Sequence, residues 1–193
     1  MERLVVATTI YRPPPEVYAF LVDFPGYANY SKYLEEVVSE GHGEGRRYAL
    51  TFAWWKLTYT AHAEVTELVE PERIEWRIRS DLDARGRWRV EPVEEAELPA
   101  DAAVGDDPGD ADDDDRDADP IAPASRAVFE AEYDPGSVHG GMFDLPRLVS
   151  LDWVLKKAKP LIREEATRVV ERAVDDIEGQ RREVELEVTL VDE

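Results

Sequence analysis

The chain contains no cysteine, few lysines, and no run of apolar residues that approaches the length of a membrane span. Without cysteine there are no disulfides, no thiol catalysis and no cysteine-ligated zinc site. The N-terminal residues 1–12 lack the apolar core of a secretory signal. We therefore expect a cytoplasmic protein without stable membrane insertion.

Positive charge is also scarce. The 193 residues include 23 Lys and Arg against 44 Asp and Glu, which gives a net charge of −21. A field of this sign repels phosphate, so nucleic acid is excluded as a partner. An acidic surface poor in lysine resembles the proteins of salt-accumulating halophiles, where high ionic strength screens self-repulsion. The composition thus predicts a halophilic archaeal source, and the alternative is an acidic protein from a mesophile.

Much of the negative charge is concentrated in residues 94–124, which hold thirteen acids and one arginine. This stretch has few apolar residues and several prolines and glycines, so burial could not offset the entropy lost on ordering it. We interpret it as a disordered acidic insertion. The aspartates at 112–115 lack the ligand spacing of a calcium loop, and we predict neither a metal nor another cofactor.

The longest helical pattern covers residues 145–178. Asp144 can cap its start, Gly179 can end it, and Pro160 predicts a kink. Apolar residues recur along one face with the 3–4 spacing of an amphipathic helix: Leu148, Leu151, Leu155, Ala158, Ile162, Ala166, Val169, Ala173 and Ile177. Such a stripe needs a large apolar partner.

Short segments with alternating apolar and polar residues can supply that partner as an antiparallel sheet. A first strand at 3–11 precedes two short helices, at 15–23 and 27–33. The remaining predicted strands are 34–41, 46–55, 56–68, 73–80, 82–91 and 125–134. Residues 183–191 alternate too, and either add an edge strand or trail in solvent. We predict one α+β domain over 1–178, interrupted at 94–124, with a tail at 179–193.

Several local motifs resemble the START-like (SRPBCC) superfamily, in particular its polyketide cyclase/dehydrase and coenzyme Q-binding members. The motifs are YRPPPEVY at 11–18, PGY at 25–27, PERI at 71–74 and GRWRVEP at 86–92. The resemblance covers about residues 3–92 and 125–178; the acidic insertion and the tail depart from the pattern. It implies a helix-grip fold, in which a curved antiparallel sheet of about six to seven strands wraps a long C-terminal helix.

The resemblance also implies a cavity between sheet and helix that binds a hydrophobic small molecule such as a lipid, quinone or polyketide. Aromatic side chains suit such a site because they offer large apolar contact areas. The candidate ligand-binding residues are Tyr48, Phe52, Trp54, Tyr59, Trp76, Trp88, Phe129 and Trp153. The alternative is that they are simply core, which is the commoner role for any one of them because aromatic stripes usually fill interiors.

Groups for acid–base catalysis are few on the inward phase of these strands. Only Tyr48, Tyr59 and Tyr133 could transfer a proton there, and the three histidines share no metal-ligand spacing. We predict no catalytic residues and favour a binding or transport protein. A polyketide cyclase or dehydratase is the alternative, and a protein-binding module of the ribosome-associated START-like type is a second.

The arginine row 85, 87 and 89 predicts a solvated sheet face that pairs with Glu75 and its neighbours, with anion binding as the alternative.

Overall fold

The computed structural model describes residues 1–41, 44–54, 57–79, 82–94, 123–137 and 151–192, with the backbone alone at 57, 135, 151–163 and 190–192. The chain enters with β1 (Glu2–Ile10), α1 (Pro14–Val22) and the 3-10 helix η1 (Phe24–Asn29). It continues through β2 (Leu34–Glu40), β3 (Arg47–Trp54), β4 (Leu57–Val69), β5 (Arg73–Ile78), β6 (Asp83–Val93), β7 (Ala124–Asp134), η3 (Pro135–Ser137), α2 (Leu151–Glu178) and β8 (Glu187–Asp192).

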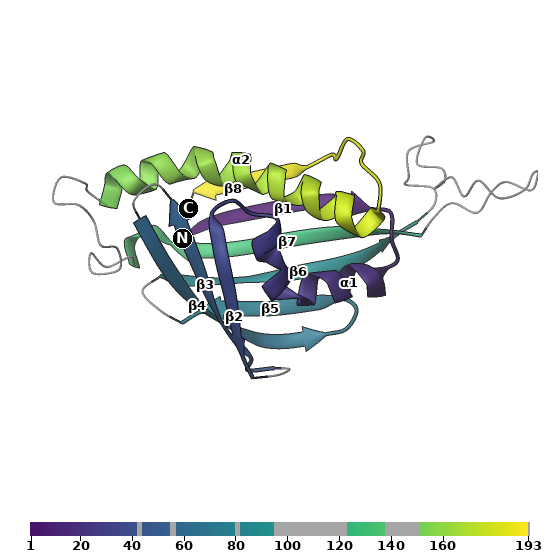
Figure 1. The fold of residues 1–193 in the computed structure, drawn as a ribbon, viewed down its shortest axis with the longest axis horizontal. Coiled ribbons are helices and arrows are strands. Elements are labelled where there is room, and N and C mark those ends of the chain that lie inside the picture. Colours follow the sequence, from purple (N-terminus) through teal and green to yellow (C-terminus); the bar gives the residue numbers. More distant parts are fainter. Residues whose placement is uncertain (42–43, 55–56, 80–81, 95–122, 138–150, 193) are drawn as a thin grey trace, which may run out of the picture.

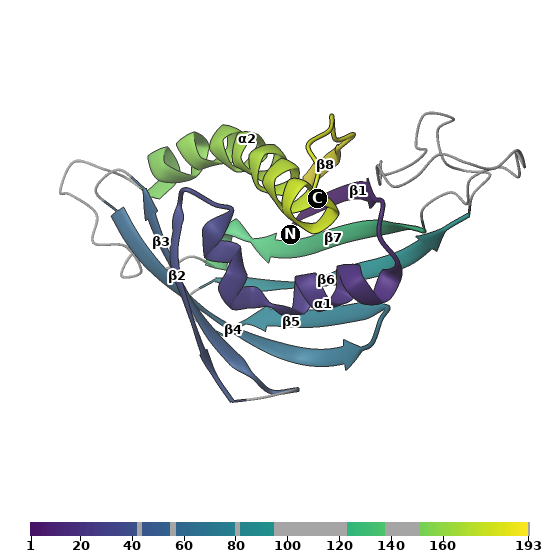
Figure 2. The ribbon, with the colours of Figure 1, turned by 45° about the vertical axis from the view of Figure 1, so that its right-hand side comes forward.

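The strands form one curved sheet in the order β2-β3-β4-β5-β6-β7-β1-β8, and every neighbouring pair is antiparallel. Helix α2 lies across the concave side of this sheet (Figures 1 and 2). Helix α1 packs against β6 and β7. The helix-grip fold predicted from the sequence is confirmed. The sheet has eight strands rather than six or seven, because the C-terminal segment pairs with β1 as β8.

The core is built from the inward phase of the strands and one face of each helix. Prolines at the start of α1 suit the first turn, where backbone N–H groups have no intrahelical partner. This helix buries Val17, Tyr18 and Leu21 against the sheet. In α2 the most buried described side chain is Val174, with 1% of its surface exposed.

The segment after α1 differs from its prediction. The sequence predicts a helix over 27–33, but the turn is the 3-10 helix η1, which begins earlier, at Phe24. Its backbone closes with short-range bonds, from Gly26 N–H to Asp23 O (3.0 Å) and from Tyr30 N–H to Tyr27 O (3.1 Å). The structure thus has one short 3-10 helix, Phe24–Asn29, in place of the predicted helix at 27–33.

The C-terminal end of α2 is capped as the sequence predicts. Gly179 adopts a φ of +73°, the left-handed conformation that favours glycine, and its N–H bonds to Asp175 O at 3.0 Å. The predicted cap Asp144, residues 145–150 and the acidic stretch 95–122 lie outside the described residues. Within the described part of the chain, no helix combines the length and apolar character needed to cross a membrane.

Candidate functional site

A cavity of about 360 Å³ lies between the concave face of the sheet and α2. Strands β1 and β3–β7 contribute most of its wall, and β2 contributes Leu34. Helix α2 covers it with Ala166, Val169 and Val170, and η1 adds Phe24 and Tyr27. Because these side chains are apolar or aromatic, the cavity can hold an apolar molecule and offers little to a charged one.

Five of the eight sequence-predicted residues line this cavity: Tyr48, Phe52, Trp76, Trp88 and Phe129. Tyr48 is buried, whereas Phe52 exposes 36% of its surface and lies at the margin. Trp54 and Tyr59 share the inward phase of their strands but fall outside the lining. The lining residues of β3 end at Phe52, and those of β4 begin at Ala61. The side chain of Trp153, on α2, lies outside the described residues.

Three of the lining aromatics contact one another on the sheet. The rings of Trp76 and Phe129 are stacked, with centroids 5.8 Å apart and planes 16° apart. Trp88 also packs against Phe129, at 4.7 Å and a tilt of 52°. Offset stacked and tilted arrangements are the favoured geometries of aromatic pairs. The three rings together form a continuous apolar floor.

Sequence reasoning missed two aromatic lining residues, Phe24 and Tyr27. They lie in η1, where the Phe24-Pro25-Gly26 sequence predicts only a break between helices. The rings of Phe24 and Tyr48 contact each other at 4.7 Å, so η1 docks directly on β3. The sequence does carry a signal, since two aromatic residues flank a Pro-Gly turn. The direction in which their rings point, however, depends on how that turn folds.

The tyrosine hydroxyls near the cavity differ in their availability for chemistry. The Tyr27 hydroxyl donates a hydrogen bond to the carbonyl of Leu21 at 2.5 Å, and burial raises its pKa well above the ordinary value. Burial also raises the pKa of Tyr48, partly opposed by the neighbouring Arg46 guanidinium. The Tyr133 hydroxyl donates to Glu2 at 2.6 Å. Tyr48 is therefore the described lining residue best placed to give a proton to a ligand.

One carboxylate, Glu64, borders the cavity in the part of the chain that the structure describes. Its side chain accepts hydrogen bonds from Arg77 and Arg79, and these bonds lower its pKa. An ionised carboxylate already held by two guanidinium groups is a poor general acid or base. Among the described residues, the site thus offers apolar contact first and acid–base chemistry only at Tyr48.

Helix α2 is held over the cavity by a polar contact with the segment between η1 and β2. Glu165, whose side chain is 10% exposed, accepts hydrogen bonds from Lys32 N–H (2.8 Å) and Ser31 Oγ (3.0 Å). Burial alone would raise the pKa of Glu165, but these bonds and Arg168 lower it overall. Further along the helix, the Arg172 guanidinium donates to Tyr30 O at 2.9 Å.

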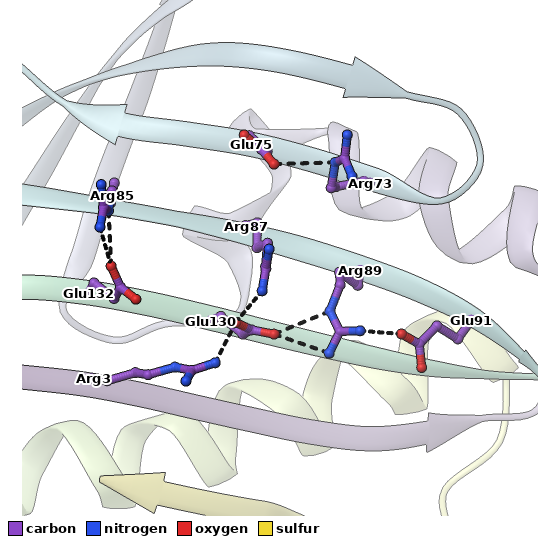
Figure 3. A network of polar contacts seen from close by, with 9 residues as sticks. All are labelled: Arg3, Arg73, Glu75, Arg85, Arg87, Arg89, Glu91, Glu130 and Glu132. Carbon is purple, nitrogen blue, oxygen red and sulfur yellow. Dashed lines mark hydrogen bonds and ion pairs between the residues drawn. The ribbon is translucent and has the colours of Figure 1, made fainter. Parts of the chain in front are cut away.

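The convex face of the sheet carries a network of ion pairs (Figure 3). Its centre is Glu130 on β7, which pairs with Arg3 on β1 and with Arg87 and Arg89 on β6. The arginine row does lie beside Glu75, as predicted, but among the described residues it forms no ion pair with it. Strand register places Arg87 opposite Glu75 on one side and opposite Glu130 on the other. The ion pairs of the row nevertheless form on the β7 side: Arg85 pairs with Glu132, and Arg89 pairs with Glu130 and also with Glu91, while Glu75 pairs with Arg73. Each guanidinium already holds a carboxylate, which disfavours anion binding here.

A curved sheet closed by a long helix over an apolar cavity defines a class of small-molecule-binding folds. The family model described as polyketide cyclase / dehydrase and lipid transport matches residues 1–176 of the chain. The chain therefore belongs to this family. A search of curated proteins finds no match.

Solved structures share the fold at low sequence identity. TTHA0849 from Thermus thermophilus is 14% identical, with a TM-score of 0.56, and the match covers 92% of this chain and 97% of that one. The Zhui aromatase/cyclase from Streptomyces sp. R1128 is 15% identical, with a TM-score of 0.56 and coverage of 92% and 94%. A START superfamily protein from Mycobacterium smegmatis is 8% identical, with a TM-score of 0.55 and coverage of 92% and 99%.

Proposed function

We propose that this protein binds a hydrophobic small molecule, of the lipid, quinone or polyketide class, in the cavity between the sheet and α2. The observation that carries the proposal is the wall of that 360 Å³ cavity, which is built from aromatic and aliphatic side chains. Burial of apolar ligand surface there would supply the driving force, at roughly 25 cal/mol per Å² removed from water. Membership of a family that includes lipid transport supports this function.

The test is to fill the cavity and compare ligand binding. Ala61 is buried on β4 and lines the cavity, so Ala61→Phe would occupy ligand space. Ala49, on the opposite phase of β3, provides the matched control Ala49→Phe, since it borders a depression outside the cavity. Native mass spectrometry of the purified proteins would detect carried ligand, and calorimetry with a quinone and a polyprenol series would measure affinity.

We expect the wild type and Ala49→Phe to bind alike and Ala61→Phe to lose at least about tenfold in affinity, the scale of one unaccommodated methylene group. Thermal unfolding of all three proteins separates lost binding from lost folding. If the wild type carries no ligand and binds neither series, the proposal fails and a protein-partner role takes its place.

A cyclase or dehydratase is the second candidate, and Tyr48 is the observation that favours it. Its hydroxyl belongs to a buried residue of the cavity wall, beside Arg46, whose guanidinium lies 5.2 Å from the Tyr48 ring centroid. A tyrosine in that setting could donate a proton to a carbonyl of a bound polyketide. Tyr48→Phe should then abolish turnover of a polyketide substrate while its binding persists. A pure binding protein would show no turnover in either form.

A further inference from the structure

The cavity floor contains a position where the sheet has no side chain. The strand registers place Trp76 of β5 opposite Gly86 of β6, and Gly86 opposite Ala131 of β7. On its other side, Trp76 lies opposite Val65 of β4. Across the sheet, the large indole of Trp76 is therefore followed by two small residues, Gly86 and Ala131.

The indole of Trp76 takes the space above Gly86. A Cβ added to Gly86 would lie 2.4 Å from Trp76 Cζ2 and 2.8 Å from Cε2, far inside van der Waals contact. The same Cβ would lie 2.4 Å from the backbone oxygen of Glu130. Only glycine is compatible with this arrangement, and a ring that covers a strand glycine compensates for the missing side chain.

The neighbouring row of the floor is built differently. Trp88 lies opposite Ile74 on β5 and opposite Phe129 on β7, so large side chains flank it on both sides. Removal of Trp88 would leave a gap bordered by these two side chains. Both indoles line the cavity, so either removal opens space in it, but only the removal of Trp76 also uncovers the bare backbone at Gly86.

We propose that Trp76 is the specificity-determining residue of the cavity. Its indole, lying over Gly86 and stacked on Phe129, closes the floor at this position and so limits how long an apolar ligand the cavity accepts. Gly86 is a positioning residue, which acts by leaving the indole the space that it occupies. This inference rests on the binding function proposed above.

Straight-chain primary alcohols from hexanol to dodecanol provide a suitable probe series. They are uncharged, so the net charge of −21 does not bias their binding. Calorimetric titration would give the affinity for each chain length in the wild type, Trp76→Leu, Trp76→Phe and Trp88→Leu. The alcohol beyond which affinity stops rising is the length limit of that protein.

In Trp76→Leu, we expect the limit to move to longer alcohols and the affinity for the longest relative to the shortest to rise at least about tenfold. Trp76→Phe should show a smaller shift in the same direction. Trp88→Leu serves as the control and should weaken binding along the whole series without moving the limit. Circular dichroism reports folding, and if Trp76→Leu does not fold, the milder Trp76→Phe decides.

The outcomes separate this inference from the function on which it rests. If the wild type binds the series and both Trp76 variants keep its length limit, the role of Trp76 is overturned while ligand binding stands. An equal shift of the limit in Trp88→Leu would also overturn it, because the effect would not be specific to the Gly86 position. If the wild type binds no alcohol, the inference fails, while the binding function itself is decided by the quinone and polyprenol titrations described above.

Discussion

Glu165 on α2 accepts a 2.8 Å hydrogen bond from the backbone N–H of Lys32, which lies 133 residues earlier in the chain. Ser31 donates to the same carboxylate oxygen, and the side chain is 10% exposed. The contact ties the helix that roofs the cavity to the segment that leads into β2. It also satisfies a backbone donor that would otherwise be left without a partner at this junction.

We predict that Glu165→Ala lowers the free energy of unfolding by about 1–3 kcal/mol, since it leaves the Lys32 N–H and the Ser31 hydroxyl unsatisfied. Chemical denaturation monitored by circular dichroism would measure this loss. Glu164→Ala is the control, because Glu164 binds the same Arg168 but its side chain is 63% exposed. Its effect should stay within about 0.5 kcal/mol. Equal losses in the two variants would contradict the proposed role of Glu165.

Acid should destabilise the protein in part through Glu130. Burial opposes ionisation of Glu130, but hydrogen bonds from Arg87 and Arg3 and the charges of Arg87 and Arg89 lower its pKa overall. A carboxyl with a lowered pKa in the folded state stabilises the fold above its unfolded pKa of about 4.3, and this stabilisation is lost as the pH falls further.

The variant Glu130→Gln removes that titration and nearly preserves the shape of the side chain. We expect it to be less stable than the wild type at neutral pH, and to lose less stability between about pH 6 and about pH 3. The thermal midpoints of both proteins would be measured over this pH range. At each pH, subtracting one midpoint from the other cancels the effect of the carboxyl groups that the two proteins share. Parallel curves for the two proteins would show that Glu130 contributes nothing to acid sensitivity.

Salt should stabilise the protein, as the halophile interpretation of the composition predicts. At a net charge of −21, like charges repel across the surface, and molar salt shortens the screening length to about 3 Å. Screening also weakens the exposed ion pairs of the convex face, but the excess of 21 negative charges makes relief of repulsion the larger effect. Melting curves in low and molar potassium chloride measure the balance. A midpoint that is equal or higher in low salt would contradict this prediction.

The acidic stretch 95–122 should be dispensable for folding. Strands β6 and β7 pair as far as Val93 and Ala124, so the two ends of the insertion already lie side by side. A short Gly/Ser turn can therefore replace it, and the thermal midpoint should stay within a few degrees, because the entropy of loop closure depends weakly on loop length. Loss of cooperative unfolding in the shortened protein would instead assign the stretch a structural role.

Much of the fold could be predicted because the patterns that specify it are local. The alternation along β3 and β5 places Tyr48 and Trp76 on the inward phase, and both line the cavity. The predicted apolar stripe of α2 includes Ala166 and Val169, which also line it. The pattern was less informative about Val170 and Val174, since a helix docked on a curved sheet buries a wider face than a single stripe.

The sequence by itself determined the order of β1–β7 and α2, the phase of these strands and the end of α2 at Gly179, because each depends on neighbouring residues. Only the tertiary structure decided that Arg87 and Arg89 pair with Glu130 rather than Glu75, because both carboxylates lie opposite Arg87 and side-chain packing selects between them. It also decided that Trp76 lies over Gly86. That placement follows from the packing of three strands against one another, and no spacing within any single strand encodes it.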